Sequence, residues 1–210
     1  NSGKAAIHAQ IRVYEWTQKN GKDVLVATEE VVSSPAMTSL APGQQQLVRI
    51  IVMQPGVRAQ EQSYRLVIDE LPDATSRAAN PNAVHFLLRY SIPVFIAGNQ
   101  DAPASHDALS CEQAEMPATL RCFNAGNRHI RLSHLEALTA DGQVVGSIKG
   151  LAGYVLPGQT ALLPLKQASR HALSTLRVYL NDDHHASQIP LRPLASRAPV
   201  LGTAHAVSPD

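Results

Sequence analysis

The stretch AVHFLLRYSIPVF, Ala83 to Phe95, has the alternation of a half-buried β-strand. Its even-numbered positions carry only apolar or aromatic side chains, namely Val84, Phe86, Leu88, Tyr90, Ile92 and Val94. The other face contains Pro93, which has no N–H to donate to a neighbouring strand. Because proline is confined to sheet edges and bulges, we expect an edge strand here. A long apolar edge favours aggregation, so a chain that keeps one needs a reason for it.

The composition argues against several classes of function. With 210 residues, the chain is long enough for one or two domains, each with its own core. Its formal net charge of +1 gives no electrostatic reason to expect a nucleic-acid or membrane-surface partner. No stretch approaches the roughly 18 consecutive apolar residues of a membrane span, so we expect no membrane insertion. The chain starts abruptly at Asn1 without a visible signal peptide, and we expect a processed N-terminus.

Short alternating runs separated by turn residues predict strands along most of the chain. The run from Ile7 to Val13 alternates with period two, and Asn20-Gly21 supplies a hairpin turn because both residues tolerate positive φ. Further candidate strands of the first half lie at 24–27, 46–53 and 64–71. No sustained helical period occurs among them, and the expected fold class is all-β.

Turn motifs of the first half recur in the same order in the second half. The pairs are Asn1-Ser2-Gly3 with Asn124-Ala125-Gly126, Asn20-Gly21 with Asp141-Gly142, and Pro42-Gly43 with Pro157-Gly158. This order predicts two copies of one immunoglobulin-like β-sandwich, at 1–98 and 99–210, joined near 98–103. Trp16 lies on the more polar face of its strand, so it does not read as the buried tryptophan of antibody domains. We expect the tail from about Ala195, rich in Ala, Pro and Ser, to be mobile.

The two cysteines, Cys111 and Cys122, lie eleven positions apart. A disulfide between them would contribute roughly 3 kcal/mol in the chain-entropy model and would indicate an oxidising compartment. Two buried free thiols are the alternative. A zinc site that includes His106 is not favoured, because the C-x₂-C spacing of structural zinc sites is absent.

Several stretches of the first half carry a family resemblance. They are QQLVRI at 45–50, SYRLVIDELP at 63–72 and IPVF at 92–95. Together they resemble the periplasmic chaperones of the chaperone–usher pathway, which assemble pili in Gram-negative bacteria. The stretches RVYEW at 12–16 and SSPA to LAPG at 33–43 are most similar to the archaic branch, whose subunits are of the spore-coat-U type. The second half matches more loosely, through NDD at 181–183.

The resemblance implies a use for the apolar edge. Such chaperones have two immunoglobulin-like domains set at an angle, and they lend the last strand of the first domain to a pilus subunit that lacks its own final strand. By matching positions, Val84, Phe86 and Leu88 would enter the subunit's groove, with Tyr90 as a fourth. Each buried side chain would contribute about 1.5–3 kcal/mol as an upper estimate. The alternative is that this face belongs to the first domain's own core.

The resemblance also implies partners and a location. The subunit would be delivered to an outer-membrane usher, all in the periplasm, and the free chaperone would self-associate through the same edge. No cofactor is implied. The first strand of the family's first domain has no counterpart in the given chain, so we expect it to be missing here.

One part of the family's pattern is replaced. Many members use a Lys in the donated strand and an Arg in the first strand to hold the subunit's C-terminal carboxylate. Pro93 stands at the position of that Lys. Arg89 lies on the same face and offers a two-pronged contact to a carboxylate. The alternative is that Arg89 is a solvated side chain that protects the edge.

The family's interdomain ion pair suggests a role for Glu70. This residue ends the inward-facing row of the stretch at 63–72 and needs a cationic or donor partner if it is buried. The resemblance implies a structural group at the domain junction that joins Glu70 with Asp182 or Asp183. The Arg that completes this group in the family is replaced by Ala97. Arg49 or Arg65 could substitute, although Arg65 reads as a surface residue.

Catalytic and metal-binding interpretations find little support. His184-His185 is the densest histidine cluster, but adjacent strand residues point to opposite faces and rarely share a metal. The sequence contains neither a G-x-S-x-G elbow nor a Gly-rich phosphate loop. We therefore expect no enzyme and no metal. Two other classes stay open: a secreted adhesive or structural protein, with the strand at 83–95 paired on both edges, and a β-sandwich enzyme with a cleft of perturbed titratable groups.

Overall fold

The computed structural model describes residues 1–54, 56–72, 86–99, 106–114, 116, 118–165 and 172–192. Within these ranges every regular element is a β-strand except one short 3₁₀ turn, η1 (His106–Ala108). The all-β prediction is therefore confirmed. No helix in the same ranges has the length and apolarity needed to cross a membrane. The expectations for Val84, for residues 100–103 of the junction and for the tail from Ala195 fall outside the described residues.

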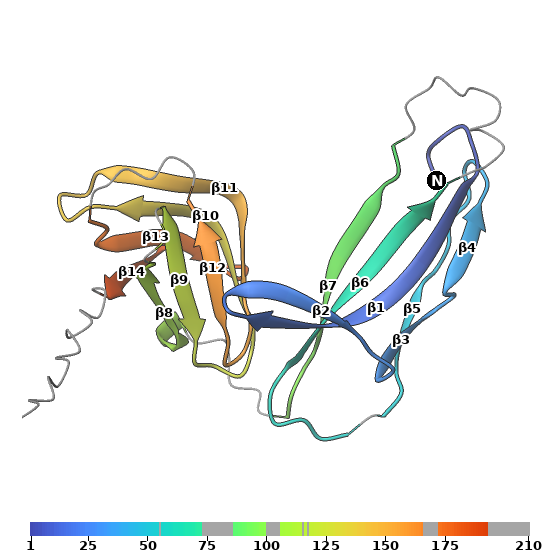
Figure 1. The fold of residues 1–210 in the computed structure, drawn as a ribbon, viewed down its shortest axis with the longest axis horizontal. Helices are drawn as coiled ribbons and strands as arrows, with labels where there is room; N and C mark the ends of the chain where they lie inside the picture. Colours follow the sequence, from blue (N-terminus) through green and yellow to red (C-terminus); the bar gives the residue numbers. More distant parts are fainter. Residues whose placement is uncertain are drawn as a thin grey trace, which may run out of the picture.

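The first sandwich contains strands β1 to β7 (Figure 1). They are β1 (Ile7–Lys19), β2 (Lys22–Ala27), β3 (Val31–Ser34), β4 (Met37–Leu40), β5 (Arg49–Val52), β6 (Gln62–Leu71) and β7 (Arg89–Ile96). One sheet has the order β2-β1-β6-β7, with β4 also paired to β1, and β3 pairs with β5 in a second sheet. Its core consists of alternate residues of β1 and β6 together with β3, because residues i and i+2 of a strand share a face. The buried members are Ile11, Val13, Val31, Tyr64 and Leu66.

The second sandwich contains strands β8 to β14. They are β8 (Leu109–Gln113), β9 (Thr119–Asn124), β10 (Ile130–Leu138), β11 (Val144–Val155), β12 (Thr160–Pro164), β13 (Thr175–Leu180) and β14 (Ser187–Arg192). Their order is β11-β10-β13-β14-β8-β9-β12. A separate core fills this sandwich and includes the fully buried Leu120, Leu132, Leu135, Leu176 and Leu180. The expectation of two β-sandwiches set at an angle is confirmed (Figure 1).

The hairpin turn predicted at Asn20-Gly21 connects β1 and β2. Both residues have positive φ, 52° and 75°, and Lys19 pairs with Lys22 across the turn. Glycine adopts positive φ without a steric penalty, and asparagine tolerates it better than most residues. In the second sandwich, Gly142 has a φ of 82° between β10 and β11. This one pair of turn motifs therefore connects two consecutive antiparallel strands in each half.

Cys111 and Cys122 form a disulfide, so the predicted pairing is confirmed and the free-thiol alternative is wrong. The two residues are direct partners in the antiparallel pair of β8 and β9, with their Cα atoms 4.1 Å apart. Both side chains are buried in the second core, at 1% and 0% exposure. The bond therefore fastens two neighbouring strands of the second sandwich.

Strand β7 is an edge strand, as Pro93 predicts. Among the described residues it pairs only with β6, in an antiparallel register that sets Arg65 opposite Pro93 (Figure 1). The strand begins at Arg89, later than the alternation from Ala83 suggests. Residues 86–88 precede it and are not part of the strand. The sequence pattern thus identifies the edge correctly but places the start of the strand too early.

Reduction of the disulfide tests its contribution to the second sandwich. We expect dithiothreitol to lower the free energy of unfolding by roughly 3 kcal/mol, because the open loop regains conformational freedom in the unfolded chain. Urea denaturation with and without reductant, followed by circular dichroism, measures the difference. The double variant Cys111→Ser/Cys122→Ser should resemble the reduced protein and should not respond to dithiothreitol. Equal stability of the oxidised and reduced forms would contradict this role.

Candidate functional site

The most unusual surface of the first sandwich is the row of apolar side chains that leads into β7. Phe86, Leu88, Tyr90 and Ile92 are exposed by 83%, 54%, 56% and 44%. Farther along the same face, Val94 and Ile96 pack against the first core. For Phe86 and Leu88, the structure therefore disagrees with the alternative that this face belongs to the core. Large apolar side chains exposed in a continuous row are typical of an interaction surface.

Arg89 is held by an acidic residue of its own chain. Its Nε donates to Asp69 on β6, and Arg12 on β1 donates to the other carboxylate oxygen of Asp69 at 2.6 Å. Hydrogen bonds from Arg89 and from Arg12 lower the pKa of Asp69, and the same contact raises the pKa of Arg89. The Arg89 side chain is still 68% exposed, so part of its guanidinium faces water. Its role in binding a carboxylate stays a prediction.

The interdomain role expected of Glu70 is wrong. Glu70 accepts a hydrogen bond from Leu88 N at 3.1 Å and donates its own N–H to the Leu88 carbonyl at 2.9 Å. Asp182, which is 96% exposed, pairs instead with Arg131 of the second sandwich, and Asp183 N donates to the Leu180 carbonyl. The reason is the length of β6, which starts at the domain junction. At the rise of a β-strand, Glu70 lies about 30 Å along it.

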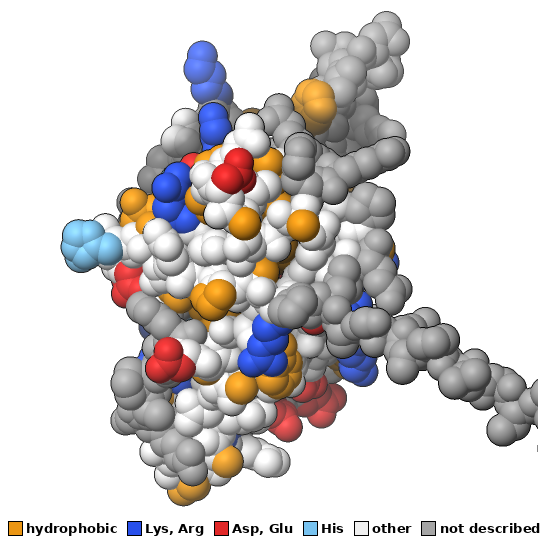
Figure 2. Space-filling view, turned by 90° about the vertical axis from the view of Figure 1, so that its left-hand side faces the viewer, with side chains coloured by type: hydrophobic (Ala, Val, Ile, Leu, Met, Phe, Trp, Pro, Cys, Tyr) orange, Lys and Arg blue, Asp and Glu red, His pale blue; other side chains and the backbone are white. Residues whose placement is uncertain are grey.

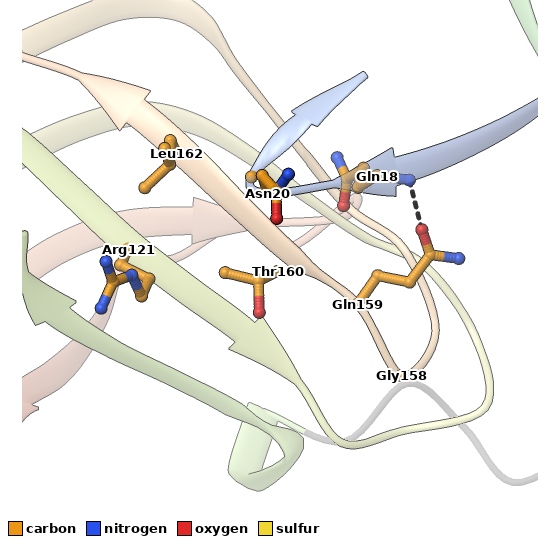
Figure 3. Close-up of a pocket in the computed structure, with 8 residues that line it drawn as sticks. Gln18, Asn20, Arg121, Gly158, Gln159, Thr160 and Leu162 are labelled. Carbon is orange, nitrogen blue, oxygen red and sulfur yellow. Dashed lines mark hydrogen bonds between the residues drawn. The ribbon is translucent and has the colours of Figure 1, made fainter. Parts of the chain in front are cut away.

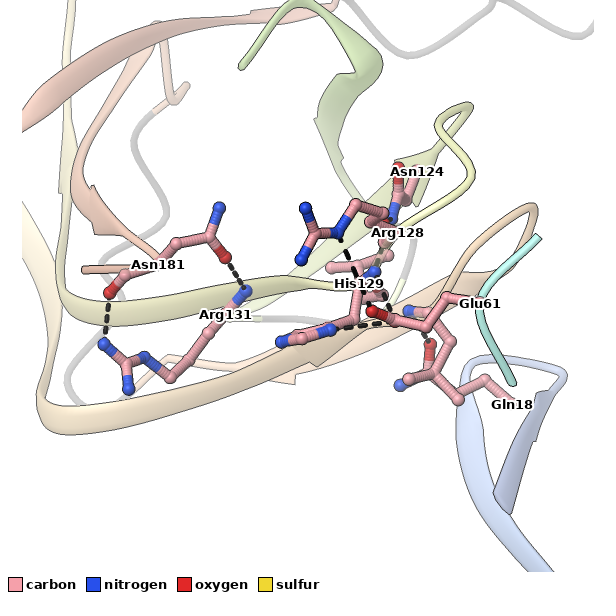
Figure 4. Close-up of polar contacts among 9 residues, drawn as sticks. Gln18, Glu61, Asn124, Arg128, His129, Arg131 and Asn181 are labelled. Carbon is pink, nitrogen blue, oxygen red and sulfur yellow. Dashed lines mark hydrogen bonds and ion pairs between the residues drawn. The ribbon is translucent and has the colours of Figure 1, made fainter. Parts of the chain in front are cut away.

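The acidic residue at the junction is Glu61, just before β6. Its side chain is 2% exposed, and one carboxylate oxygen accepts from His129 N at 2.8 Å and lies 2.8 Å from His129 Nδ1 (Figure 4). The other oxygen lies 4.0 Å from Arg128 Nε, and Glu61 N donates to the Asn127 carbonyl at 3.0 Å. These contacts satisfy a carboxylate that burial would otherwise destabilise. Sequence reasoning missed this residue, because only its place next to a strand marks it.

Aromatic side chains from both sandwiches meet beside Glu61. The ring of His129 stacks on Phe95 of β7 with 3.5 Å between centroids, and Trp16 meets Tyr154 edge-on at 5.5 Å. Trp16 is only 2% exposed, although its strand pattern placed it on the polar face. The second sandwich covers that face at this end, which explains the difference. Phe95 therefore ties the end of β7 to the second sandwich.

Arg65 is part of the same junction and is not a surface residue. Its guanidinium carbon lies 3.6 Å from the centroid of the Trp16 ring and 5.6 Å from that of Tyr154. Its side chain is 15% exposed, and its nearest carboxylate is Asp23 at 3.8 Å. Burial lowers the pKa of Arg65 from its usual value. The contact with Trp16 lies within the first sandwich, where a desolvated cation over an aromatic face contributes about 2 kcal/mol, and the contact with Tyr154 extends from Arg65 to the second sandwich.

Gln18, near the tip of the β1–β2 hairpin, binds the backbone of the second sandwich. Its Nε2 donates to the Tyr154 carbonyl at 2.8 Å, and its Oε1 accepts from Leu156 N at 3.1 Å. In return, the side-chain oxygen of Gln159 accepts from Gln18 N (Figure 3). The Gln18 side chain thus makes the two backbone hydrogen bonds that a neighbouring strand would make with residues 154–156.

The turn of the same hairpin lies against β12. Leu162 N donates to the Gly21 carbonyl at 2.9 Å, and a Cβ at Gly21 would come within 2.2 Å of Leu162 Cγ. Glycine is therefore required here for close approach as well as for φ. A cavity of about 540 Å³ lies beside this contact and is lined in part by Asn20, Arg121 and Thr160 (Figure 3).

No group of metal-ligating side chains occurs among the described residues. His184 and His185 lie in an exposed loop there. Figure 2, which faces the second sandwich, shows basic, acidic and hydrophobic side chains interspersed over that side. The site that the structure emphasises is therefore β7, with one exposed half and one half packed against the second sandwich.

Comparison with known proteins agrees with this geometry. A family model for pili and flagellar-assembly chaperones, PapD N-terminal domain, matches residues 1–100. No curated protein sequence matches the chain.

Solved structures of chaperones resemble the chain along most of its length. A chain in the Acinetobacter baumannii complex of CsuC with the tip adhesion subunit CsuE, from archaic chaperone–usher pili, has 24% identity and a TM-score of 0.67, covering 92% of this chain and 88% of that one. The Pseudomonas aeruginosa CupB2 chaperone has 18% identity and a TM-score of 0.60, covering 91% and 89%. A chain in the Salmonella enterica complex of SafA pilin with the SafB chaperone has 16% identity and a TM-score of 0.58, covering 90% and 84%.

At these identities the structural matches establish the fold, and the family model establishes the kind of domain. The predicted resemblance to pilus-assembly chaperones, including those of the archaic branch, is confirmed. Residues 1–100 match the model for pili and flagellar-assembly chaperones, PapD N-terminal domain, and the chain as a whole has the two-sandwich fold of chaperone–usher pilus chaperones.

Proposed function

We propose that this chain binds pilus subunits in the periplasm of a Gram-negative bacterium by adding its edge strand β7 to their incomplete fold. The observation that supports this is the exposed apolar row of Phe86, Leu88 and Tyr90, which leads into a strand that has one partner among the described residues. Strand addition supplies main-chain hydrogen bonds along the edge, and alternate side chains fill pockets of the partner. Val84 continues the row in the sequence and is proposed as a further contact.

The partner that fits this surface is an immunoglobulin-like subunit that lacks its final strand. Its open groove exposes core positions, and burial of Phe86 and Leu88 in it contributes about 1.5–3 kcal/mol per side chain as an upper estimate. This burial free energy, added to the main-chain hydrogen bonds, is enough to keep a subunit bound. It is also small enough for the strand of another subunit to replace the chaperone's strand. We further propose delivery of the bound subunit to an outer-membrane usher. The disulfide between Cys111 and Cys122 fits the oxidising periplasm.

A secreted adhesive or structural protein is the alternative. It requires the strand at 83–95 to be paired on both edges, whereas β7 has one partner among the described residues. A β-sandwich enzyme requires a cleft of perturbed titratable groups. Asp69 and Arg89, whose pKa values shift, lie on the outer face of a sheet and are accounted for by their mutual contact. Burial and the neighbouring Glu30 raise the pKa of Tyr64 in the first core, and burial lowers the pKa of Arg65 at the junction. The chaperone function has the stronger support.

Replacing the exposed apolar side chains tests the proposal. We expect Phe86→Ser and Leu88→Ser each to lower the affinity for a co-expressed pilus subunit that lacks its final strand by at least tenfold, because each removes about 1.4 kcal/mol or more of apolar burial. Leu25→Ser is the matched control, since Leu25 is 42% exposed on β2, away from β7. Co-purification of the one-to-one complex from co-expressing cells, with proteolysis of the subunit as a second readout, measures the effect. Equal losses in all three variants would argue against a specific contact.

The contribution of Arg89 needs two variants. We expect Arg89→Ala to weaken subunit capture about tenfold, through loss of a two-pronged contact to a carboxylate. We expect Asp69→Asn, which releases Arg89 from its intrachain partner, to preserve capture. If both variants lose capture equally, Arg89 acts only by positioning β7 through Asp69. An unchanged yield of complex with Arg89→Ala would remove Arg89 from the site.

Self-association of the free protein follows from the same exposed edge. We expect the sedimentation-equilibrium mass to rise with protein concentration, because two β7 edges can pair with each other. The variant Phe86→Lys should stay monomeric, since a charged side chain at an edge opposes pairing. Wild-type protein with the mass of a monomer at every concentration would contradict the expectation.

A further inference from the structure

The solvent exposure of the side chains changes along residues 86–96, which lead into β7 and form it. Residues 86–92 are all exposed, whereas 93–96 are all partly buried. The change falls at Pro93, the one residue of β7 that cannot donate a backbone hydrogen bond. Two independent properties, exposure and hydrogen-bonding capacity, thus change at the same position.

The direction of the backbone groups gives this coincidence a consequence. Glu70 N donates to the Leu88 carbonyl, so Leu88 turns its backbone toward β6. Because residues alternate in an antiparallel pair, Tyr90, Ile92 and Val94 also turn their N–H and C=O groups toward β6. The odd-numbered residues turn theirs to the free edge. Pro93 therefore removes no bond from the β6–β7 ladder, and the donor that it lacks is missing from the outer edge.

Beyond Pro93, residues of β7 and of the segment after it contact other parts of the same chain. The ring of Phe95 lies between Trp16 and His129, at centroid distances of 6.0 Å and 3.5 Å. A little farther on, Asn99 N donates to the Arg58 carbonyl at 2.6 Å, and a Cβ at Gly98 would lie 2.7 Å from the Gln60 carbonyl carbon. Arg58 and Gln60 lie just before β6, so these two contacts continue the β6–β7 pairing, and the Phe95 ring is held on one face of the sheet by the second sandwich.

We propose that Pro93 ends the surface for strand addition. A partner strand pairs with the outer N–H and C=O groups of Arg89 and Ser91 and finds no donor at Pro93. The side chains that follow are held by the chain's own contacts, Phe95 by the second sandwich and Val94 and Ile96 by the first core. The inference rests on the proposed function, because it takes the partner to be a pilus subunit's strand. In this proposal, the hydrogen-bond ladder between β7 and the partner strand ends at Pro93. The position of Pro93 therefore restricts the register in which the partner can pair.

Amide exchange by NMR tests the limit directly, on the full chain alone and in complex with a co-expressed pilus subunit that lacks its final strand. We expect the amides of Arg89 and Ser91 to exchange at least tenfold more slowly in the complex, and that of Phe95 to exchange at the same rate in both. Slowing at Phe95 together with Ser91 would overturn the inference and leave the proposed function intact. A complex without slowing at Arg89 and Ser91 would contradict strand addition itself, and so would the absence of a complex.

A displaced proline provides a second test. Ser91→Pro moves the limit two residues earlier and removes a donor from the outer edge, while the ladder to β6 keeps its bonds. We expect about tenfold weaker subunit binding, and no such loss for the control Ser91→Ala, which keeps the N–H. Urea denaturation of the free variants verifies that Ser91→Pro still folds. Equal affinity of the two variants would show that the partner does not pair at Ser91.

Discussion

The outer edge of β7, which has no strand partner among the described residues, is the constraint on which the rest of the first sandwich depends. Its N–H and C=O groups are exposed to water and to other chains, and a row of apolar side chains stands beside them. Such an edge is a hazard unless it has a partner. Charge at Arg89 and the missing donor at Pro93 limit wrong pairing, and both devices leave the ladder to β6 intact. The edge is thus both available and restricted in length.

The chain holds this edge in place at its two ends by different chemistry. At the far end, Glu70 binds both backbone groups of Leu88, and Asp69 holds Arg89. At the near end, Phe95 stacks on His129, whose backbone and ring bind the buried Glu61. Far-end contacts are exposed ion pairs and hydrogen bonds, which contribute little individually. Near-end contacts are buried and aromatic, and they couple the end of β7 to the second sandwich.

Local patterns in the sequence predicted what depends on local physics. Period-two alternation predicted the strands, Asn20-Gly21 predicted the hairpin turn, and Pro93 predicted the edge strand. Each of these features depends on only a few neighbouring residues. The disulfide was predicted because its cysteines lie close together in the chain.

The junction was not predicted correctly, because it joins residues far apart in the sequence. His129 and Glu61 are 68 positions apart, and Gln18 and Tyr154 are 136 apart. Strand parity alone placed Trp16 and Arg65 on a solvent face, since nothing local announces that a second sandwich covers it. The error for Glu70 has the same origin, because the family's pattern fixed the residue type but not the end of β6 that meets the junction.

Preordering of β7 explains how a modest surface can capture a partner. Folding of the first sandwich has already fixed β7 against β6, so the chaperone loses little conformational freedom when a strand is added. The partner loses the freedom of its own strand, and apolar burial at Phe86 and Leu88 must offset that loss. In the proposed function Pro93 keeps the ladder short, which would hold the total binding free energy low enough for release of the subunit. An edge strand without the proline would pair with a longer segment of the partner and bind it more tightly. The partner would then be harder to release to another subunit.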